Sequence, residues 1–451
     1  MTKFKFKRIA SFLTVFIIAF AGASCTQNQS GGAVPDGHGT FLVGPEKPCD
    51  AADHSGDLSN GGPSGVVGAV TTDANYSSSA LWALDVASDR FCPVANGEAG
   101  DLFLTAAGDG LALFSRNSPQ LNYTVFTAVG RTAQQATPFA ENGDPHALRV
   151  FRDNGFVRWL IALNTAGKLV EFDPVVPRDG AVVVPEDFSR ASPGRVFRPV
   201  DVIVVKGEEI DSNLLKASNG KADSDYIFAL HQGLDPYYRS NYSQAIYAWR
   251  RVGPGQYAEV DLDKSKGGIN GFPLRFSNPS GFIQKSGRLS FLSLCFSTDA
   301  NCLKGLEYID LKEIGNIQQT HLVTDFSGNA IFSNGLTATG APVKLNSNDK
   351  PVMLAFSSVQ MSSGKKIVSI DIASGALQTI HTFDAAGSAY YGLVYDQVSS
   401  NLLVGDTDGT RALMWAYPIG PNGKASGKAA RYVLASPGQP YPMQLVLLNK
   451  N

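Results

Sequence analysis

The sequence predicts an all-β protein built from repeated antiparallel hairpins. Apolar runs of about five to eight residues, rich in β-branched and aromatic side chains, recur beyond residue 60 between clusters of Gly, Asn, Asp and Ser. The 451 residues include 46 glycines and 24 prolines, a composition that favours turns over long helices. No stretch of about 15 residues repeats its apolar side chains at the helical period of roughly 3.6, so alternating strand–helix units are not expected.

Seven stretches combine two apolar runs with a turn between them. Several of these turns contain Gly or Asn, which supply the positive φ angles that tight hairpins need. The seven stretches are residues 80–94, 110–126, 158–172, 244–260, 305–323, 365–383 and 411–434. Further short strands are expected at residues 201–207, 225–233, 288–294 and 351–358.

Hairpins of this kind cannot bury both faces alone and must stack on their neighbours. Radial stacking into a β-propeller leaves only short edges, and this is the predicted fold. Residues 50–448 give about seven to nine blades at roughly 45–60 residues each, and the seven hairpins predict seven, with six or eight left open. The run at 441–448 is expected to complete a blade begun by residues 65–72, which would join the chain ends. A pair of β-sandwich domains divided near residues 180–200 is the alternative fold.

Two segments resemble known propeller repeats. Residues 369–383 are similar to the outer hairpin of YVTN-type and PQQ-type repeats, with Asp371 starting the turn and Gly375 closing it. Residues 392–419 resemble an NHL or related six-bladed repeat. The positions in the expected order are Gly392, Asp396, residues 402–404, Asp406 and residues 412–417. These resemblances imply a fold and say little about activity, because propellers host many unrelated functions.

The first 24 residues have the features of a secretory signal. Residues 1–8 carry four basic side chains and no acidic one, and residues 9–21 form an apolar run. That run is shorter than the roughly 20 apolar residues of a transmembrane helix, and small residues follow it as at a signal cleavage site. We therefore expect export and exclude residues 1–24 from the fold.

Ala23, Ser24 and Cys25 resemble the last three positions of a bacterial lipoprotein lipobox. That family prefers Leu three residues before the cysteine, where this chain has Gly22. The resemblance implies that Cys25 is acylated after cleavage, and two or three acyl chains give a stable membrane anchor. Cleavage after Ala23 by an ordinary signal peptidase is the competing interpretation, because the small residues before it also fit that enzyme's pattern.

Residues 25–48 are rich in Gly, Pro and polar side chains and lack apolar periodicity, which is typical of a flexible tether. About 23 such residues span roughly 25–30 Å as a coil. The propeller domain is expected to occupy residues 49–451. Thr26 follows the cysteine, and in enteric-type bacteria a residue other than Asp at this position resembles the signal for the outer membrane. The sequence thus predicts a lipoprotein of the outer membrane that faces the periplasm or the cell surface.

The composition excludes nucleic acid as an expected partner. The 38 basic and 40 acidic residues give a net charge of −2, and only 17% of residues are charged. Removal of the signal takes away four basic residues, which leaves 34 basic against 40 acidic residues and a net charge of −6. A mildly acidic chain has no electrostatic attraction for DNA or for an anionic membrane surface.

The five cysteines fit an exported protein. If Cys25 carries lipid, four cysteines remain, an even number. Cys295 and Cys302 bracket a turn-rich segment and are expected to form a hairpin disulfide, so Cys49 and Cys92 pair by elimination. Four cysteines allow three connectivities, so other pairings and buried free thiols stay open.

A tyrosine-rich stretch is the main candidate for a partner-binding surface. Tyr237, Tyr238, Arg239 and Tyr242 lie among Asp, Pro, Ser and Asn, which indicates a loop. Exposed Tyr and Arg side chains suit the recognition of peptides, sugars or protein surfaces. A loop that folds over and buries its rings is the alternative, and neither interpretation is favoured.

Other residues are candidates for the axis or for the core. His231 ends an expected strand and is a candidate for facing the propeller axis. Tyr247 and Trp249 alternate along a strand, where one of the two rings is expected in the core. His321 and His381 occupy equivalent places in two outer hairpins, which indicates repeat structure rather than a site.

No catalytic residue and no cofactor is predicted. Asp406 and Asp408 in GDTDGT suggest clustered oxygen ligands for calcium, but no Glu follows at the EF-hand spacing, and an Asp-rich turn is the favoured interpretation. Ser218 and Ser362 each precede a lysine by three residues, in Gly-rich turns where no helix is expected. The sequence contains no G-x-S-x-G elbow, no phosphate-binding loop and no dinucleotide fingerprint.

These features favour a lipid-anchored propeller that binds or scaffolds protein or glycan partners in the envelope. A PQQ-like propeller lipoprotein of outer-membrane assembly is similar in architecture, without a close sequence match. The alternative is an exported propeller enzyme, either a metal-assisted hydrolase such as a lactonase or a quinone-dependent dehydrogenase. The repeat resemblance motivates this alternative, and the binding module is the preferred hypothesis.

Overall fold

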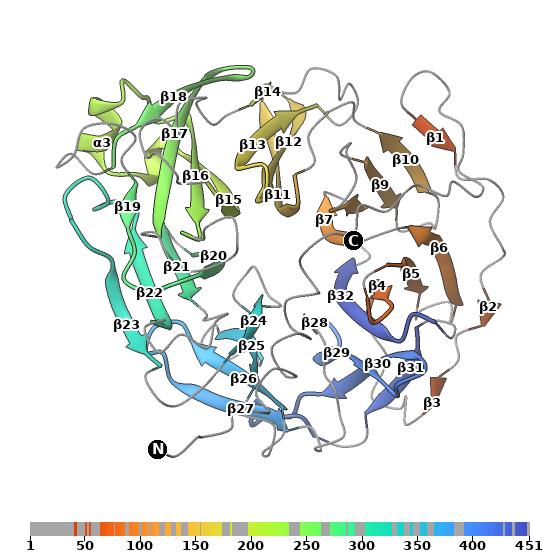
Figure 1. Ribbon diagram of the computed structural model, residues 1–451. Coiled ribbons are helices and arrows are strands. Elements are labelled where there is room, and N and C mark those ends of the chain that lie inside the picture. Colours follow the sequence, from red (N-terminus) through yellow and green to blue (C-terminus); the bar gives the residue numbers. More distant parts are fainter. Residues whose placement is uncertain are drawn as a thin grey trace, which may run out of the picture.

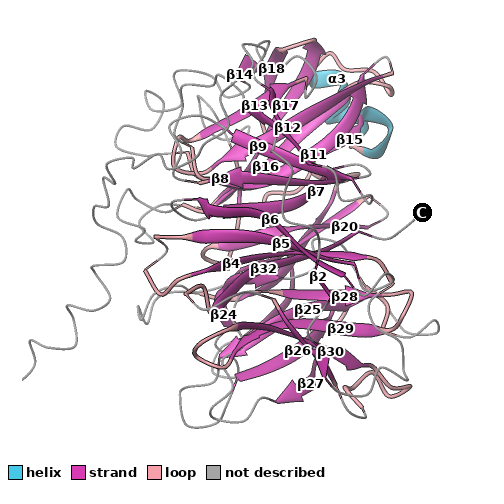
Figure 2. Ribbon diagram, turned by 90° about the vertical axis from the view of Figure 1, so that its right-hand side faces the viewer, coloured by secondary structure: helices cyan, strands magenta, loops and turns pink. Residues whose placement is uncertain are grey.

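The computed structural model contains seven antiparallel sheets arranged around a central axis (Figure 1). Seen from the side, the strands run across the thickness of the ring (Figure 2). The structure describes residues 40–42, 50–51, 54–55, 64–75, 77–85, 90–98, 102–107, 110–116, 122–127, 132–136, 143–153, 155–173, 181–182, 197–233, 244–262, 271–285, 287–293, 303–326, 332–337, 343–345, 352–358, 365–382, 392–426, 429–434 and 438–448.

Each sheet is one blade, and its strands follow one another from the axis outward. Blade 1 contains β32 (Tyr441–Leu448), β4 (Val66–Thr72), β5 (Ser79–Asp85) and β6 (Arg90–Glu98). Blade 2 contains β7 (Leu102–Ala107), β8 (Gly110–Ser115), β9 (Asn122–Thr127) and β10 (Thr132–Ala136). Blade 3 contains β11 (Pro145–Asp153), β12 (Phe156–Leu163), β13 (Lys168–Phe172) and β14 (Ala181–Val182). Blade 4 contains β15 (Pro199–Lys206), β16 (Asp225–His231), β17 (Ala245–Gly253) and β18 (Gln256–Val260), and β19 (Phe272–Pro273) also pairs with β17.

The remaining blades have the same order. Blade 5 contains β20 (Pro279–Lys285), β21 (Arg288–Ser293), β22 (Gly305–Asp310) and β23 (His321–Asp325). Blade 6 contains β24 (Phe332–Thr337), β25 (Val352–Ser358), β26 (Lys365–Asp371) and β27 (Leu377–Thr382). Blade 7 contains β28 (Leu393–Asp396), β29 (Asn401–Thr407), β30 (Ala412–Pro418) and β31 (Ala430–Val433).

The two ends of the domain meet in blade 1. The C-terminal strand β32 pairs antiparallel with β4, from Tyr441 opposite Thr72 to Leu448 opposite Val66. This confirms the predicted closure and the predicted seven-bladed propeller, and the two-sandwich alternative is wrong. Hydrogen bonding between strands from the two ends of the domain closes the ring in blade 1.

Three short N-terminal strands add outer edges to three blades. Strand β1 (Thr40–Leu42) pairs with β10, β2 (Asp50–Ala51) with β6 and β3 (His54–Ser55) with β31. Residues 40–42 lie within the segment interpreted as a tether, so that part of the segment is attached to blade 2 in the structure.

The core is divided among the contacts between neighbouring blades. Each of the seven buried apolar clusters joins two adjacent blades, and together they complete the circuit. Strand β16 shows the consequence for the sequence. Ile227 and Ala229 pack toward blade 3, while Tyr226, Phe228 and Leu230 pack toward blade 5. A strand buried on both faces needs a continuous apolar run, which explains the apolar runs in the sequence.

The innermost strands all begin at one face of the ring, which we call the mouth face. Strands β11, β15, β20 and β32 have a proline at or next to their start and a register shift directly after it. Proline is tolerated there because an innermost strand is an edge of its sheet. A β-bulge changes the direction in which the side chains beside it point.

A short helical insertion lies on the opposite face. The 3₁₀ turn η3 (Gly207–Glu209) and helix α3 (Ser212–Ala217) connect β15 to β16 (Figure 2). Asp211 caps the helix, because its carboxylate accepts hydrogen bonds from the Asn213 and Leu214 backbone N–H groups at 2.8 and 3.0 Å. This helix was not expected, and Ser218 lies at its C-terminal end, where its hydroxyl bonds the Leu214 carbonyl. Among the described residues, no helix has the length and apolar character to span a membrane.

Candidate functional site

A polar cluster lies at the mouth face where blades 2 and 3 meet. Asp144 directly precedes β11, and His146 is the residue at the β11 bulge. Arg116 directly follows β8, and Thr165 closely follows β12. We call these four residues the Asp144 cluster.

The other three side chains of the cluster all contact the Asp144 carboxylate. His146 Nε2 lies 3.0 Å from Asp144 Oδ2, Thr165 Oγ1 donates to the same oxygen at 3.3 Å, and Arg116 Nε lies 3.6 Å from Oδ1. The Asp144 backbone is left-handed with φ of 47°, and its carbonyl accepts a hydrogen bond from the Asn164 N–H at 2.9 Å. A strained conformation of this kind persists only where its surroundings fix it, and such positions cluster at functional sites.

Asp144 stays ionised at neutral pH. Burial alone would raise its pKa, but the neighbouring His146, Arg116 and Thr165 outweigh burial and lower the pKa to about 2. The side chains of Arg116, Asp144 and His146 are 25%, 19% and 27% exposed. All three side chains are therefore partly accessible to solvent.

A buried polar network adjoins this cluster through Asn164. Arg198 Nη1 donates to Asn164 Oδ1 at 3.2 Å, and Asn164 Nδ2 donates to the Pro199 carbonyl at 3.1 Å and to Gln232 Oε1 at 3.3 Å. The Arg198 backbone N–H donates to His231 Nδ1 at 2.9 Å. These side chains come from the mouth-face connections of blades 3 and 4, so the network fixes the two blades to each other.

His231 belongs to the core and does not open to the axis. Its side chain is buried, its ring stacks on Phe197 at 5.5 Å, and Tyr247 lies edge-on to it at 5.8 Å. Tyr247 and Trp249 are both buried and both lie against Phe197. The alternating sequence pattern predicted only one of these two rings in the core. His321 and His381 lie in the outer strands β23 and β27, as the repeat pattern indicates.

A second carboxylate joins three innermost strands. Asp201 of β15 accepts a hydrogen bond from Arg149 of β11 at 2.6 Å and another from the backbone N–H of Phe282 in β20 at 2.8 Å. Burial raises the pKa of Asp201, and the positive charge of Arg149 opposes that rise. Gln444 of β32 bridges blades 1 and 2 in a similar way, through hydrogen bonds with both the N–H and the carbonyl of Leu104.

The connection from β16 to β17 leaves and returns at the mouth face. At its start, the Gln232 N–H donates to the Arg198 carbonyl at 3.1 Å. At its end, the Gln244 carbonyl accepts a hydrogen bond from the Leu274 N–H at 3.0 Å. Both ends of this connection are therefore fixed to blade 4, and the first of them belongs to the buried network.

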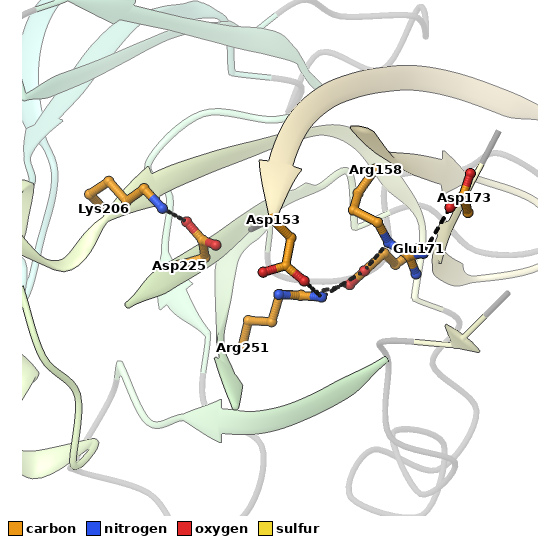
Figure 3. Close-up of polar contacts among 7 residues, drawn as sticks. All are labelled: Asp153, Arg158, Glu171, Asp173, Lys206, Asp225 and Arg251. Carbon is orange, nitrogen blue, oxygen red and sulfur yellow. Dashed lines mark hydrogen bonds and ion pairs between the residues drawn. The ribbon is translucent and has the colours of Figure 1, made fainter. Parts of the chain in front are cut away.

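An ion network joins blades 3 and 4 away from the mouth (Figure 3). Buried Glu171 accepts hydrogen bonds from Arg158 at 2.7 Å and from Arg251 at 3.0 and 3.1 Å. Arg251 also donates to Asp153 at 2.8 Å, and hydrogen bonding to both acids raises its pKa against the effect of burial. Arg158 lies 4.0 Å from Asp173. These ion pairs hold the two blades to each other, which is a structural role.

A cavity of about 360 Å³ lies between blades 6 and 7 on the opposite face. Leu345, Val352, Leu377 and Pro421 supply apolar lining. Polar lining comes from Ser369, Asp371, Gln378 and Asn422. Gln378 Nε2 donates to the Asn422 carbonyl at 3.1 Å, which ties the two walls together.

Most of the residues predicted for lipidation, disulfides, partner binding or metal binding lie outside the described residues. This applies to the lipidation candidate Cys25, to Cys49, Cys295 and Cys302, and to the partner-binding candidates Tyr237, Tyr238, Arg239 and Tyr242. Cys92 lies in β6, where its side chain is not described. These assignments stay predictions.

Asp406 and Asp408 are held by different partners. Asp406 Oδ2 accepts a hydrogen bond from Trp415 Nε1 at 2.9 Å. Asp408 lies in the turn after β29, where it accepts hydrogen bonds from Thr410 and Arg411 that hold its pKa far below the ordinary value. Across the described residues, no group of three or more His, Cys, Asp or Glu side chains is placed to hold a metal ion.

The Asp144 cluster was missed in the sequence because its members are far apart. Arg116 and Thr165 lie on different blades, and nothing in the sequence shows that their loops meet at one face. Asp144 and His146 are close in sequence, and their Asp-x-His spacing at the start of a strand was the available signal. The ion network was missed for the same reason, because Glu171 and Arg251 are 80 positions apart.

Comparisons with known proteins agree with the fold and do not name a family. No family model matches the chain, and no curated protein matches it. Among solved structures, an ACO/RPE65 chimera is 12% identical, with a TM-score of 0.51 over 93% of this chain and 97% of that one. A putative 6-phosphogluconolactonase from Bacteroides fragilis is 13% identical, with a TM-score of 0.46 over 85% and 98% of the two chains. At such low identity the likeness concerns architecture alone, and the chain is a seven-bladed β-propeller.

Proposed function

We propose that this chain is an exported, lipid-anchored envelope propeller that binds or scaffolds a protein or glycan partner through its mouth face at blade 4. The observation that carries the proposal is the anchoring of the connection between Gln232 and Gln244. Its two ends are hydrogen-bonded to Arg198 and Leu274, and the side chains of Gln232 and Gln244 are buried. The sequence between them contains Tyr237, Tyr238, Arg239 and Tyr242.

Anchored ends favour binding for an energetic reason. Ordering a loop on association costs free energy, and fixing both of its ends in advance lowers that cost. Tyrosine and arginine provide large contact area with polar tips, which is why they dominate binding energy at many interfaces. The buried network supports this arrangement, because Asn164 and the Arg198 side chain fix blade 4 to blade 3 next to Gln232, where the connection starts.

Chemical crosslinking in native membranes, followed by mass spectrometry, tests the proposal. We expect one recurrent partner, with crosslinks at residues 233–243, and loss of that partner in the double variant Tyr237→Ala/Tyr238→Ala. Phe156→Ala is the matched control, because Phe156 is an aromatic residue 69% exposed on the opposite face. Equal loss of the partner in the control variant would show that the mouth face is not the docking surface. Recovery of polysaccharide rather than protein would identify a glycan partner.

A further inference from the structure

The protonation of His146 follows from its single carboxylate partner. An ionised carboxylate can only accept hydrogen bonds, so His146 Nε2 carries the proton that lies between it and Asp144 Oδ2 at 3.0 Å. A neutral imidazole then has its lone pair on Nδ1. No hydrogen-bond partner is found for His146 Nδ1 among the described residues, and the side chain is 27% exposed. In the neutral form of the ring, the proton-accepting nitrogen of His146 is therefore Nδ1.

Three features fix this ring in place. The β11 bulge sets the direction of His146, and the left-handed backbone of Asp144 turns its carboxylate back toward the ring. Asn164 holds the Asp144 carbonyl and Thr165 holds its carboxylate, so the orienting group is itself oriented from blade 3. A base within hydrogen-bond distance of an orienting carboxylate is the arrangement found in general-base catalysis.

We propose that the Asp144 cluster is a hydrolytic site for a small ester or lactone carbonyl, with His146 as the catalytic general base. Asp144 is the positioning residue, because it acts through the imidazole. Arg116 lies on the other oxygen of the same carboxylate and is 25% exposed, so its positive charge can also stabilise a developing oxyanion. This inference goes beyond partner binding and does not depend on it.

The reaction needs water and no redox partner. His146 Nδ1 takes a proton from a water molecule as the water oxygen forms a bond to the carbonyl carbon. The π electrons of the carbonyl move to its oxygen, and the guanidinium of Arg116 stabilises that negative charge. Collapse breaks the bond from carbon to the alkoxy oxygen, and the proton on Nδ1 passes to that leaving oxygen. The products are a carboxylic acid and an alcohol, and His146 is neutral again.

His321 provides a matched control. Its Nε2 lies 2.5 Å from Glu313, and its side chain is 41% exposed, so it is also an exposed histidine bonded to an acid. It differs in its surroundings, since its ring stacks on Tyr308 at 4.8 Å and it lies in the outer strand β23. If exposure and an acidic neighbour were enough for reactivity, both histidines would behave alike.

The first experiment measures which ring nitrogen carries the proton. We expect ¹⁵N NMR of the histidine side chains, recorded at a pH where the imidazoles are neutral, to show His146 protonated on Nε2 and not on Nδ1. In Asp144→Asn, which tolerates the left-handed backbone, this preference is expected to weaken because the amide can also donate. A wild-type ring protonated on Nδ1 would overturn the proposal, whatever the activity.

The second experiment measures hydrolysis of p-nitrophenyl acetate by the chain without its signal. We expect release of p-nitrophenolate above the buffer rate, a loss of about a hundredfold in His146→Gln, and no change in His321→Gln. Gln keeps a donor toward Asp144, and circular dichroism would show that the variant folds. A His146→Gln variant that is folded and retains the wild-type rate would refute the assignment, as would an equal loss in His321→Gln. The partner experiment above is unaffected by either result.

Discussion

At the scale of single residues, Glu171 stabilises the contact between blades 3 and 4. Its carboxylate is fully buried and accepts hydrogen bonds from Arg158 and Arg251 (Figure 3). Removing one member of a buried ion network leaves charges without compensation, which costs about 3–5 kcal/mol. We expect Glu171→Ala to lower the free energy of unfolding by that amount, as measured by urea denaturation.

The ion pair of Lys206 with Asp225 is the control for this prediction. Its two charged atoms are 2.5 Å apart, but the Lys206 side chain is 48% exposed (Figure 3). Exposed pairs contribute about 0–1 kcal/mol because water screens them. We expect Lys206→Ala to change the free energy of unfolding by less than about 1 kcal/mol. Similar losses in Glu171→Ala and Lys206→Ala would contradict the structural role given to the network.

The ionised Asp144 carboxylate makes part of the free energy of unfolding depend on pH. Its pKa is lowered from 3.8 to about 2 in the fold, so the ionised form is favoured by folding. The resulting stabilisation, about 2 kcal/mol, is fully present above about pH 4 and is lost as the pH falls through about 2. We expect Asp144→Asn to be less stable than the wild type at pH 6 and equally stable near pH 2. A difference that persists unchanged at pH 2 would show that the lowered pKa is not its cause.

At the scale of elements, β32 determines whether the ring closes. It supplies the innermost strand of blade 1, buries Leu445 and Leu448 in two interblade clusters, and reaches blade 2 through Gln444. We expect a chain ending at residue 440 to lose its cooperative thermal transition and to expose apolar surface to a hydrophobic dye. A chain ending at residue 448 is the control and is expected to melt as the full chain does. A cooperative transition in the shorter chain would show that β32 is dispensable.

The disulfide bond between Cys49 and Cys92 is a second prediction at the scale of elements. Strand β2 begins at Asp50, the residue after Cys49, and Asp50 lies opposite Phe91, the residue before Cys92. This register of β2 and β6 supports the pairing reached by elimination. Mass spectrometry of an unreduced digest is expected to give one crosslinked peptide pair for Cys49 and Cys92 and one for Cys295 and Cys302. Any other pairing, or free thiols in the unfolded exported chain, would contradict the prediction.

The sequence predicts the strands better than the sites because the two depend on different information. The apolar runs, the turn residues and the match between residues 65–72 and 441–448 are local or terminal features, and they sufficed for seven blades and for closure. Helix α3 was missed because its six residues are too few to show a helical period. The Asp144 cluster depends on loops of different blades meeting at one face. The sequence around Arg116 and Thr165 does not show that they are neighbours, because their proximity depends on how the blades are arranged in the folded ring.

At the scale of the whole molecule, the membrane attachment that we propose depends on Cys25 alone. The chain without its signal has a net charge of −6, so an anionic membrane would repel it and only acyl chains would hold it there. We expect Cys25→Ala to move the protein from the membrane fraction to the soluble fraction of the envelope. Thr26→Ala, which keeps the cysteine, is expected to stay in the membrane fraction. Retention of Cys25→Ala in carbonate-washed membranes would mean that something other than lipid anchors the propeller, and the mouth face would then be the first surface to test.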